Sequence, residues 1–405
     1  MDWKWNTVAL CSICNMINSA DRIIMPIVIV SMTDKYEWDL HQQGWILSSF
    51  AFGYIASQLI GSKASKKYGN KRVLAFAVLA WSLATIVTPV ISSHLYLLIF
   101  CRILIGLGDG LGLPTIFAIF SQRIPIQRRS SAFVYLIAAG HIGQTMSALV
   151  CPHLEWELAF YLFGGLGLAW LLLWLVSFKE DYVNTSTQDD ELPLVEFPDK
   201  SRQLKWTKFL WSWPLWAIYI AHFSMNWSNY IIMQWLPTYF VRYLEASKEA
   251  VSWTAVPYIV NSLCELAVAR SAEWLSARNW PLLSVRRLMT FIGLFGPAIF
   301  LILFSIVNSL TFAVIFVSIA MGLCAFNSAG HLSNHTDVVP NHASITFAIS
   351  NTISTIPGIL CGPVTAELVT ESHGRWLPVF VIAAAVNCVG AVIYASQSTV
   401  SPVYQ

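Results

Sequence analysis

Five side chains of Asp, Glu, Lys or Arg type interrupt the long apolar segments of this sequence: Asp21, Arg22, Arg102, Asp109 and Glu265. A charge near the centre of a bilayer costs roughly 2.5–3.5 kcal/mol on insertion scales, so such residues usually face a bundle interior or an aqueous cavity. An arginine in that position offers parallel donors that suit a carboxylate or a phosphate. The set therefore indicates a site for a mobile anion inside a membrane.

Arg102 and Asp109 lie seven residues apart in one apolar segment. At 3.6 residues per turn they share a helix face at a separation of roughly 10 Å, too long for a simple ion pair but short enough to line one cavity. We expect Arg102 to be the principal anion-binding residue; the alternative is a structural salt bridge between helix bundles. Arg22 directly follows Asp21, so the two point about 100° apart, and Arg22 is the better candidate to face inward.

The other titratable side chains favour coupling, gating or structural roles. Glu265 lies near the inner end of its apolar segment and close to Arg270, which favours a gate or a packing salt bridge over a substrate contact. Histidine titrates near neutral pH, so proton coupling competes with structural hydrogen bonding for each histidine in or near these segments. Those histidines are His141, His222, His331 and His335.

The composition is that of a membrane protein. Of 405 residues, 56% are hydrophobic and 11% are charged, whereas soluble domains have nearer a quarter charged residues. A spanning helix needs roughly 20 mostly apolar residues, and lipid excludes open strands because it offers backbone groups no hydrogen-bond partner. We therefore predict an all-α membrane protein with twelve transmembrane helices. The predicted segments are 6–31, 42–61, 73–92, 95–119, 131–151, 158–178, 210–240, 251–269, 288–306, 310–329, 344–366 and 376–396.

A polar stretch divides the chain. Residues 179–208 lack apolar periodicity, which predicts a six-helix bundle over 1–178, a linker over 179–208 and a second six-helix bundle over 209–405. Lysine and arginine are concentrated on the side of the termini and the linker, so the positive-inside rule places these in the cytoplasm or its equivalent. The sequence leaves the identity of the membrane open, and no basic tail indicates a nucleic-acid partner.

The two halves show weak self-similarity. The glycine-to-proline intervals 106–125 and 322–340 are nearly equal and fall between the same pair of predicted helices in each half. Six plus six helices with parallel repeats are typical of the major facilitator fold, whose site lies near the membrane midplane between the halves. In this register Arg102 corresponds to Ser318, so the fold does not require a charge at that place.

Chemistry other than transport finds little support. The sequence lacks the G-x-x-x-x-G-K-[ST] loop that binds ATP and lacks a cluster of metal ligands. Cys11 and Cys14 form a C-x-x-C pair in an apolar helix without a second pair, and we interpret the scattered cysteines as small core residues. We expect neither an enzyme nor a bound cofactor or metal.

Four stretches resemble the anion transporter family that includes sialin, the vesicular glutamate and nucleotide transporters and the plastid phosphate transporters. RILIGLGDGLGLPTIFAIFSQRIPIQRRS (102–130) resembles that family's fourth helix and the following loop. DRIIMPIVIV (21–30) and NWSNYIIMQWLPTYF (226–240) are similar to its first and seventh helices. SNHTDVVPNHASITFAISNTISTIPGI (333–359) resembles its N-H-x-D-x-x-P block.

The resemblance implies roles for individual residues. Arg22 and Arg102 match arginines implied to attract the anion, and Asp109 replaces a glutamate implied in cation or proton coupling. Asn226 and His335 lie in the matched stretches and complete the candidate substrate-binding set. The candidate coupling or gating residues are Asp109, His141, Glu265, Glu273, Lys67 and Arg72.

Two departures from the family pattern matter. Vesicular glutamate members carry an arginine where this chain has Met225, which counts against glutamate. The loop GSKASKKYGNKR (61–72) has Ser62 and Lys66 in place of the usual glycine and aspartate, which puts the acidic gating contact of that loop in doubt. The equivalent loop in the second half keeps an acid, Glu273.

The sequence thus predicts a secondary active transporter that moves an anion by alternating access. Inorganic phosphate and small organic anions are both open, and coupling is expected to an ion gradient, of H⁺ or Na⁺, or to the membrane potential. The alternatives are a carrier of nucleotides or larger organic anions and a non-transporting receptor with the same fold. The expected partners are a small anion, that coupling ion and the lipid bilayer.

Overall fold

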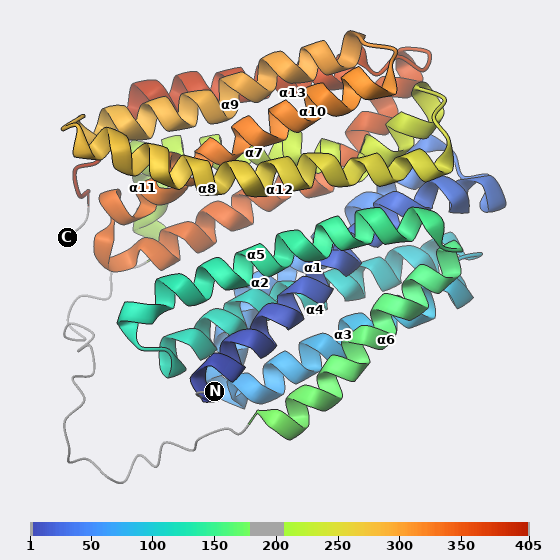
Figure 1. Ribbon diagram of the computed structural model, residues 1–405, viewed down its shortest axis with the longest axis horizontal. Coiled ribbons are helices and arrows are strands. Elements are labelled where there is room, and N and C mark those ends of the chain that lie inside the picture. Colours follow the sequence, from blue (N-terminus) through green and yellow to red (C-terminus); the bar gives the residue numbers. More distant parts are fainter. Residues whose placement is uncertain (1–2, 179–205, 404–405) are drawn as a thin grey trace.

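The computed structural model describes residues 3–178 and 206–403, and in these residues it contains helices and no strands (Figure 1). The predicted all-α class is therefore confirmed. The predicted linker lies almost entirely in 179–205, outside the described residues, and its last residues begin a short 3₁₀ helix, Trp206–Trp211. The long helices are α1 (Trp3–Tyr36), α2 (Leu40–Tyr68), α3 (Asn70–Ile91), α4 (Leu95–Arg123), α5 (Ile126–Val150), α6 (Trp156–Ser177), α7 (Trp213–Thr238), α8 (Ala255–Ala277), α9 (Leu282–Ile306), α10 (Leu310–Cys324), α12 (Ala343–Glu371) and α13 (Leu377–Gln397).

Ten helical stretches are apolar and long enough to cross a membrane. The two other long helices, α2 and α7, have 29 and 26 residues, which also suffices to span a bilayer. They are more often interrupted by polar side chains: α7 carries His222, Asn226, Asn229 and Gln234. Together these helices give the predicted twelve spans in the described chain.

The tenth span is broken, which the sequence pattern did not predict. α10 ends at Cys324, a 3₁₀ turn follows over Ala325–Ser328, and α11 (His331–Val338) continues the span beyond the expected end at residue 329. The buried Asn327 amide donates hydrogen bonds to the carbonyl oxygens of Gly293 (2.8 Å) and Cys324 (3.0 Å). Gly293 lies four residues before Pro297 of α9, which has no N–H to donate. The Asn327 side chain thus supplies the missing donor to α9 and also binds the carbonyl oxygen at the end of α10.

The helices pack in two sets with the same internal pairing. In the first set, α4 packs on α2 and α3, α1 packs on α5 and α6, and α3 packs on α6. In the second, α10 packs on α8 and α9, α7 packs on α12 and α13, and α9 packs on α13. α4 and α10 therefore occupy equivalent positions, and the first six helices fill the lower half of Figure 1 while the later ones fill the upper half.

Glycines let α4 approach α2 closely. A Cβ added to Gly106 would overlap the carbonyl oxygen of Phe50, and one added to Gly53 would overlap that of Ile103. Small residues of this kind are typical where membrane helices touch. The close approach fixes the position of α4, and with it Asp109, relative to α2.

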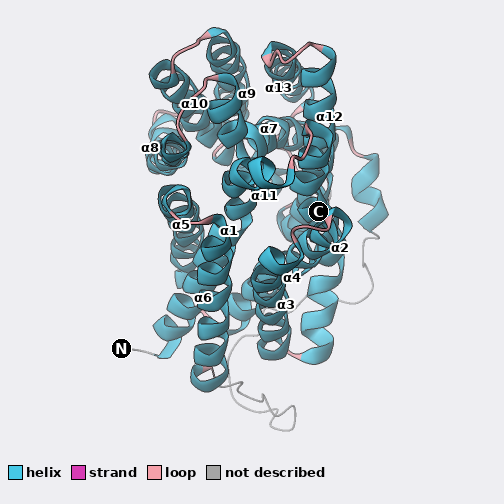
Figure 2. Cartoon of the chain, turned by 90° about the vertical axis from the view of Figure 1, so that its right-hand side faces the viewer, coloured by secondary structure: helices cyan, strands magenta, loops and turns pink. Residues whose placement is uncertain are grey.

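The bundle is closed at one end and divided at the other. Both described chain ends lie at what we call the inner end, where the Val403 N–H donates to the Val338 carbonyl oxygen. There the first helix set has one apolar cluster of its own and the second set has two. At the outer end one cluster, which includes Val30, Trp235 and Phe380, unites both sets. Figure 2 gives a view along the bundle with the two sets above and below.

Two further contacts close the outer end. Asp34 of α1 pairs with Arg242 and Lys248 of the second set. α2 meets α12 so closely that a Cβ on Gly44 would lie 2.6 Å from the carbonyl oxygen of Gly362. The space between the two helix sets therefore opens toward the inner end.

Candidate functional site

A polar cavity of about 330 Å³ lies between the two helix sets. The first set contributes one wall from α1, α2 and α5, and the second contributes the other from α7, α8, α12 and the broken α10–α11 span. Its polar lining consists of Arg22, Tyr54, His141, Gln144, His222, Asn226, Asn229, Tyr230, Tyr258, Asn261, Glu265, Asn327, Ser328, Asn351 and Thr355. A midplane cavity with such a lining suits a hydrophilic ligand.

Arg22 is held at the cavity wall by Asp109. Its Nη2 and Nε donate to Asp109 Oδ2 at 2.6 and 3.0 Å, and Asn18 Nδ2 donates to Asp109 Oδ1. The Arg22 side chain keeps 22% of its surface exposed whereas Asp109 keeps 3%. The carboxylate is therefore part of the wall, and the guanidinium is the part of the pair that a ligand in the cavity can reach.

Aromatic rings from α2 flank this guanidinium. Arg22 Cζ lies 5.0 Å from the centroid of the Phe50 ring and 4.7 Å from that of Tyr54. Both distances are within cation–π range, which stabilises the cation without neutralising it. The rings therefore orient Arg22 while leaving its charge available to an anion.

Arg102 does not share the cavity, contrary to the sequence prediction that it lines one cavity with Asp109. It is 2% exposed, its Cζ lies 5.5 Å from the Phe50 centroid, and its Nε has no hydrogen-bond partner among the described residues. The two residues share a face of α4, but Arg102 lies two turns nearer the outer end, where the bundle is closed. Asp109 pairs instead with Arg22, from a different helix.

Asp21 points away from the cavity. Thr85 Oγ1 of α3 donates a hydrogen bond to Asp21 Oδ2 at 2.8 Å, and Asp21 is 3% exposed. The adjacent Arg22 faces inward, as the 100° offset between neighbouring helical residues led us to expect.

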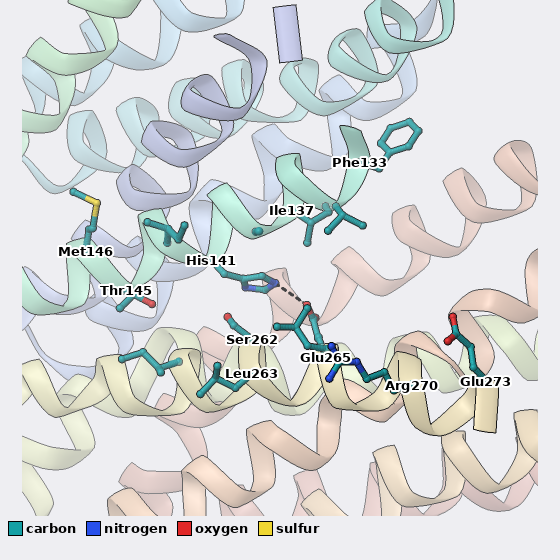
Figure 3. Close-up of a pocket in the computed structure, with 15 residues that line it drawn as sticks. Phe133, Ile137, His141, Thr145, Met146, Ser262, Leu263, Glu265, Arg270 and Glu273 are labelled. Carbon is teal, nitrogen blue, oxygen red and sulfur yellow. Dashed lines mark ion pairs between the residues drawn. The ribbon is translucent and has the colours of Figure 1, made fainter. Parts of the chain in front are cut away.

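His141 of α5 and Glu265 of α8 meet across the two helix sets. His141 Nε2 lies 3.3 Å from Glu265 Oε2, a contact that Figure 3 marks with a dashed line. Both residues line the central cavity. The nitrogen is not directed as in a well-formed hydrogen bond, so the contact is an ion pair when the imidazole is protonated. The partner of Glu265 is thus His141 and not the nearby Arg270.

The other candidates divide between the cavity and the inner end. Asn226 lines the cavity and donates to the Ser354 carbonyl oxygen at 3.0 Å. His335 does not reach the cavity; it lies buried in α11 with Nδ1 3.1 Å from Thr346 Oγ1. His222, which hydrogen-bonds Ser350 at 2.8 Å, faces the cavity in its place.

Three gating candidates lie outside the cavity. Lys67, Arg72 and Glu273 are exposed near the inner end, and Glu273 lines a second, apolar groove. The side chains of Ser62 and Lys66 lie outside the described residues. Any gating role for these charges would therefore act through the inner end and not through contact with a ligand in the cavity.

The sequence reading missed the amide-rich wall of the second helix set. Asn229, Asn261, Asn327 and Asn351 all line the cavity beside the expected Asn226. Asparagine is costly inside a membrane unless it is paired or hydrated, so its recurrence in apolar segments was the available signal. The described residues contain no group of His, Cys, Asp and Glu able to hold a metal ion.

Comparison with known proteins identifies the family. The model of the Major Facilitator Superfamily matches residues 9–361. The chain belongs to the major facilitator superfamily. It is thus a multi-pass membrane transporter and not an enzyme, and the twelve-helix major facilitator architecture is confirmed.

Curated relatives confirm the resemblance to the anion transporter family. The chain is 35% identical to human "Sialin" over 383 residues, covering 89% of this chain and 76% of the relative. It is 32% identical to "Sodium-dependent phosphate transport protein 1, chloroplastic" of Arabidopsis thaliana, covering 98% and 79%. It is 30% identical to "Ascorbate transporter, chloroplastic" of the same plant, covering 96% and 74%.

Solved structures share the fold at low identity. An inward-facing, unoccupied bacterial homologue of the human lysosomal transporter Spinster superposes with a TM-score of 0.80 at 14% identity, over 99% of this chain and 98% of that one. A D-xylose-proton symporter gives a TM-score of 0.76 at 12% identity, over 98% of each chain. These similarities establish how the helices are arranged. The class of substrate must be inferred from the residues that line the cavity.

Proposed function

We propose that this chain carries a small anion across the membrane by alternating access and binds it beside Arg22 in the central cavity. The observation that carries the proposal is the position of Arg22, whose partly exposed guanidinium faces the space between the two helix sets. A guanidinium at this place can form two parallel charge-assisted hydrogen bonds to a carboxylate or a phosphate. The names of the relatives, a sialin and transporters of phosphate and ascorbate, agree with an anionic substrate.

The cavity favours an anion with an uncharged polar body. One arginine faces a wall of neutral amides from the second helix set, including Asn226, Asn261 and Asn351. Amides both donate and accept hydrogen bonds, so they suit hydroxyl groups better than further charges. A small organic acid with hydroxyl groups matches this arrangement, whereas a nucleotide with several phosphates would need more cations.

We further propose that a proton on Asp109 couples to the anion. In the structure the Asp109 carboxylate accepts hydrogen bonds from two donors of Arg22, Nε and Nη2. Protonation of Asp109 would remove that competing charge and free the guanidinium for an incoming anion. The anion and the proton would then enter together, which makes the transporter a symporter; Na⁺ is the alternative coupling ion.

Alternating access would require the two helix sets to move as units. We propose that residues 1–178 and 209–405 are these units and that the termini lie on the cytoplasmic or an equivalent side, as the lysine and arginine distribution suggests. His141 and Glu265 join the units beside the cavity. A change in this pair would therefore accompany each cycle.

Uptake into liposomes tests the proposal. Purified protein is reconstituted and supplied with labelled phosphate, ascorbate, a hydroxylated sugar acid or ATP under imposed pH, Na⁺ or voltage gradients. We expect accumulation of one class of small anion when the outside is acidic. Binding without accumulation would support a receptor instead, and accumulation of ATP alone would support the nucleotide carrier.

A further inference from the structure

A small cavity lies inside the second helix set, next to the central cavity. Its volume is about 10 Å³, which is room for one water molecule or one small ion. Helices α7, α9, α10 and α13 form its walls. The polar side chains that line it are Ser228, Asn229 and Asn387, together with the thiol of Cys324. We call this the α7–α13 cavity.

Asn387 of α13 brings an oxygen atom without a partner to this cavity. Its amide nitrogen donates a hydrogen bond to Ser228 Oγ at 2.9 Å. Its Oδ1 is buried and accepts no hydrogen bond from the described residues, and the whole residue is 1% exposed. A buried acceptor without a partner destabilises a protein. The α7–α13 cavity therefore needs an occupant that oxygen atoms can bind, which is either a hydrogen-bond donor or a cation.

Two backbone features make the surroundings of the cavity electronegative. Pro297 of α9 has no N–H, so the carbonyl oxygen of Gly293 lacks its partner within the helix. Asn327 Nδ2 binds that oxygen, which keeps a second lone pair. α10 ends at Cys324, and the last carbonyl groups of a helix carry partial negative charge. Interrupted helices hold Na⁺ in this way in other secondary transporters, so the surroundings favour a cation over a water molecule.

The α7–α13 cavity occupies the place in the second helix set that Asp109 has in the first. Asn18 of α1 and Asn229 of α7 each lie eight residues before the proline inside their helix. Asn18 contacts Asp109 of α4, and Asn229 Oδ1 correspondingly accepts from Cys324 Sγ of α10 at 3.5 Å. Since α4 and α10 are equivalent, a cation in the α7–α13 cavity would lie at the same depth as the Asp109 carboxylate.

The wall between the α7–α13 cavity and the central cavity is thin. Met225, Asn229, Met321 and Cys324 line both. An ion that enters through the central cavity would therefore pass Asn229. Once bound, its charge would raise the positive potential beside the space where the anion binds, which favours binding of the anion.

We propose that the α7–α13 cavity binds one Na⁺, with Asn387 Oδ1 and Ser228 Oγ as ligands and Asn229 at the entrance. The proposal rests on the proposed function and adds a Na⁺ site in the second helix set to the proton site at Asp109 in the first. Amide and hydroxyl oxygens suit a hard cation. A divalent ion would need carboxylates, and none among the described residues lines the cavity. The volume fits Na⁺ better than the larger K⁺.

Binding of radiolabelled Na⁺ to the purified full chain tests the site without requiring transport. We expect the wild type to bind the label, and unlabelled NaCl to displace it where KCl or choline chloride at the same ionic strength does not. Asn387→Ala and Ser228→Ala should each weaken the affinity for Na⁺ about tenfold, the effect of one lost contact with a charged group. Asn387→Asp should bind Na⁺ more tightly, because it keeps an oxygen in place and adds a negative charge.

Matched variants separate the site from a general effect on the second helix set. Asn334 is another buried amide whose Oδ1 has no partner among the described residues, and Ser224 lies four residues before Ser228 on α7. Neither lines the α7–α13 cavity. Asn334→Ala and Ser224→Ala should therefore bind Na⁺ as the wild type does.

Three results would overturn the proposal in favour of a cavity that holds only a water molecule. They are equal displacement by KCl and NaCl, an unchanged affinity in both cavity variants, and equal losses in the cavity variants and their controls. Uptake of the anion into liposomes is measured on the same preparations. Uptake without Na⁺ binding would remove the Na⁺ site and keep the proposed function, whereas Na⁺ binding without uptake would keep the site and remove the function.

Discussion

Arg22 of α1 and Asp109 of α4 form an ion pair across two helices, with Arg22 Nη2 2.6 Å from Asp109 Oδ2. The pair is one-sided, because Asp109 is almost fully buried while Arg22 keeps 22% of its side-chain surface exposed. Asn18 satisfies the second carboxylate oxygen, Oδ1. A ligand in the cavity can therefore compete with Asp109 for Arg22, and the competition makes separate predictions for the two partners.

Removing the guanidinium charge at Arg22 should abolish transport and also destabilise the fold. Arg22→Ala leaves the buried Asp109 carboxylate without its cation, which typically costs about 3–5 kcal/mol. Arg22→Lys keeps the charge but loses the planar guanidinium group that donates two parallel hydrogen bonds, so we expect partial uptake with a raised KM. The measurements are anion uptake per folded protein and the thermal unfolding midpoint.

A double variant separates binding from stability. Arg22→Ala combined with Asp109→Asn removes both charges, so the unfolding midpoint should recover toward that of the wild type while uptake stays absent. Uptake at the wild-type rate in Arg22→Ala would refute the assignment of Arg22 as the anion-binding residue.

Arg102 should matter less than Arg22 to an anion that enters from the inner end. Arg102 is 2% exposed and is not among the residues that line the cavity. It can therefore attract an anion there by its charge but not by direct contact. We expect Arg102→Met to leave equilibrium binding of the substrate largely intact and Arg22→Met to abolish it, as measured by calorimetry on purified protein. Equal losses of affinity would place Arg102 in direct contact with the anion.

The spans were predictable because lipid leaves the backbone no alternative to the helix. Apolar length located ten of them in the described residues, and the other two, α2 and α7, were recognised as mostly apolar segments that polar side chains interrupt. The partner of Asp109 was not predictable, because Arg22 lies 87 residues away and meets it only through the packing of α1 against α4. The seven-residue spacing suggested that Arg102 lines a cavity together with Asp109. That spacing shows that two residues share a helix face, but it does not show whether both lie at the depth of the cavity.

The break in the tenth span shows a similar limit. The segment after α10 is polar, HLSNHTDV, so hydropathy ended the predicted span at residue 329 and gave no sign that a second helix follows. The break itself lies at Asn327, whose side chain reaches the Gly293 carbonyl of α9. His222 and His335 were both candidates as histidines in or near the predicted spans. Only the rotation and depth of their helices place His222 at the cavity and His335 beside Thr346.

Close packing of α4 on α2 predicts a sharp difference between two glycines. Gly106→Ala would place a methyl group against the backbone of α2 at Phe50, and overpacking of this kind costs about 1–3 kcal/mol. Gly165→Ala on α6 meets nothing within 4 Å, so the better helix propensity of alanine should leave it as stable or more so. Thermal unfolding in detergent compares the two, and an unchanged midpoint for Gly106→Ala would contradict the packing.

Closure of the outer end depends on the α2–α12 contact. A side chain at Gly362 would collide with Gly44 and Ser48, so Gly362→Val should hold the outer end open. Cys324 lines the central cavity and reports on its access. A membrane-impermeant thiol reagent should label Cys324 of the variant, but not of the wild type, from the outer side of sealed vesicles.

Cys324→Ser in both backgrounds identifies the labelled thiol. Identical labelling of the wild type and Gly362→Val from both sides would show that this contact does not control access to the cavity.

Asp109 should govern the coupling of transport to the proton gradient. Asp109→Asn removes both the titratable group and the charge that competes for Arg22, while the amide oxygen still accepts a hydrogen bond. The anion should therefore bind at all pH values, and anion exchange between equal solutions should continue. Accumulation driven by an acidic outside should disappear, because no proton is taken up with the anion. Asp21→Asn is the matched control, since it removes a buried carboxylate that contacts Thr85 and not the cavity. Uptake that still follows the pH gradient in Asp109→Asn, or that loses it equally in Asp21→Asn, would remove Asp109 from the coupling step.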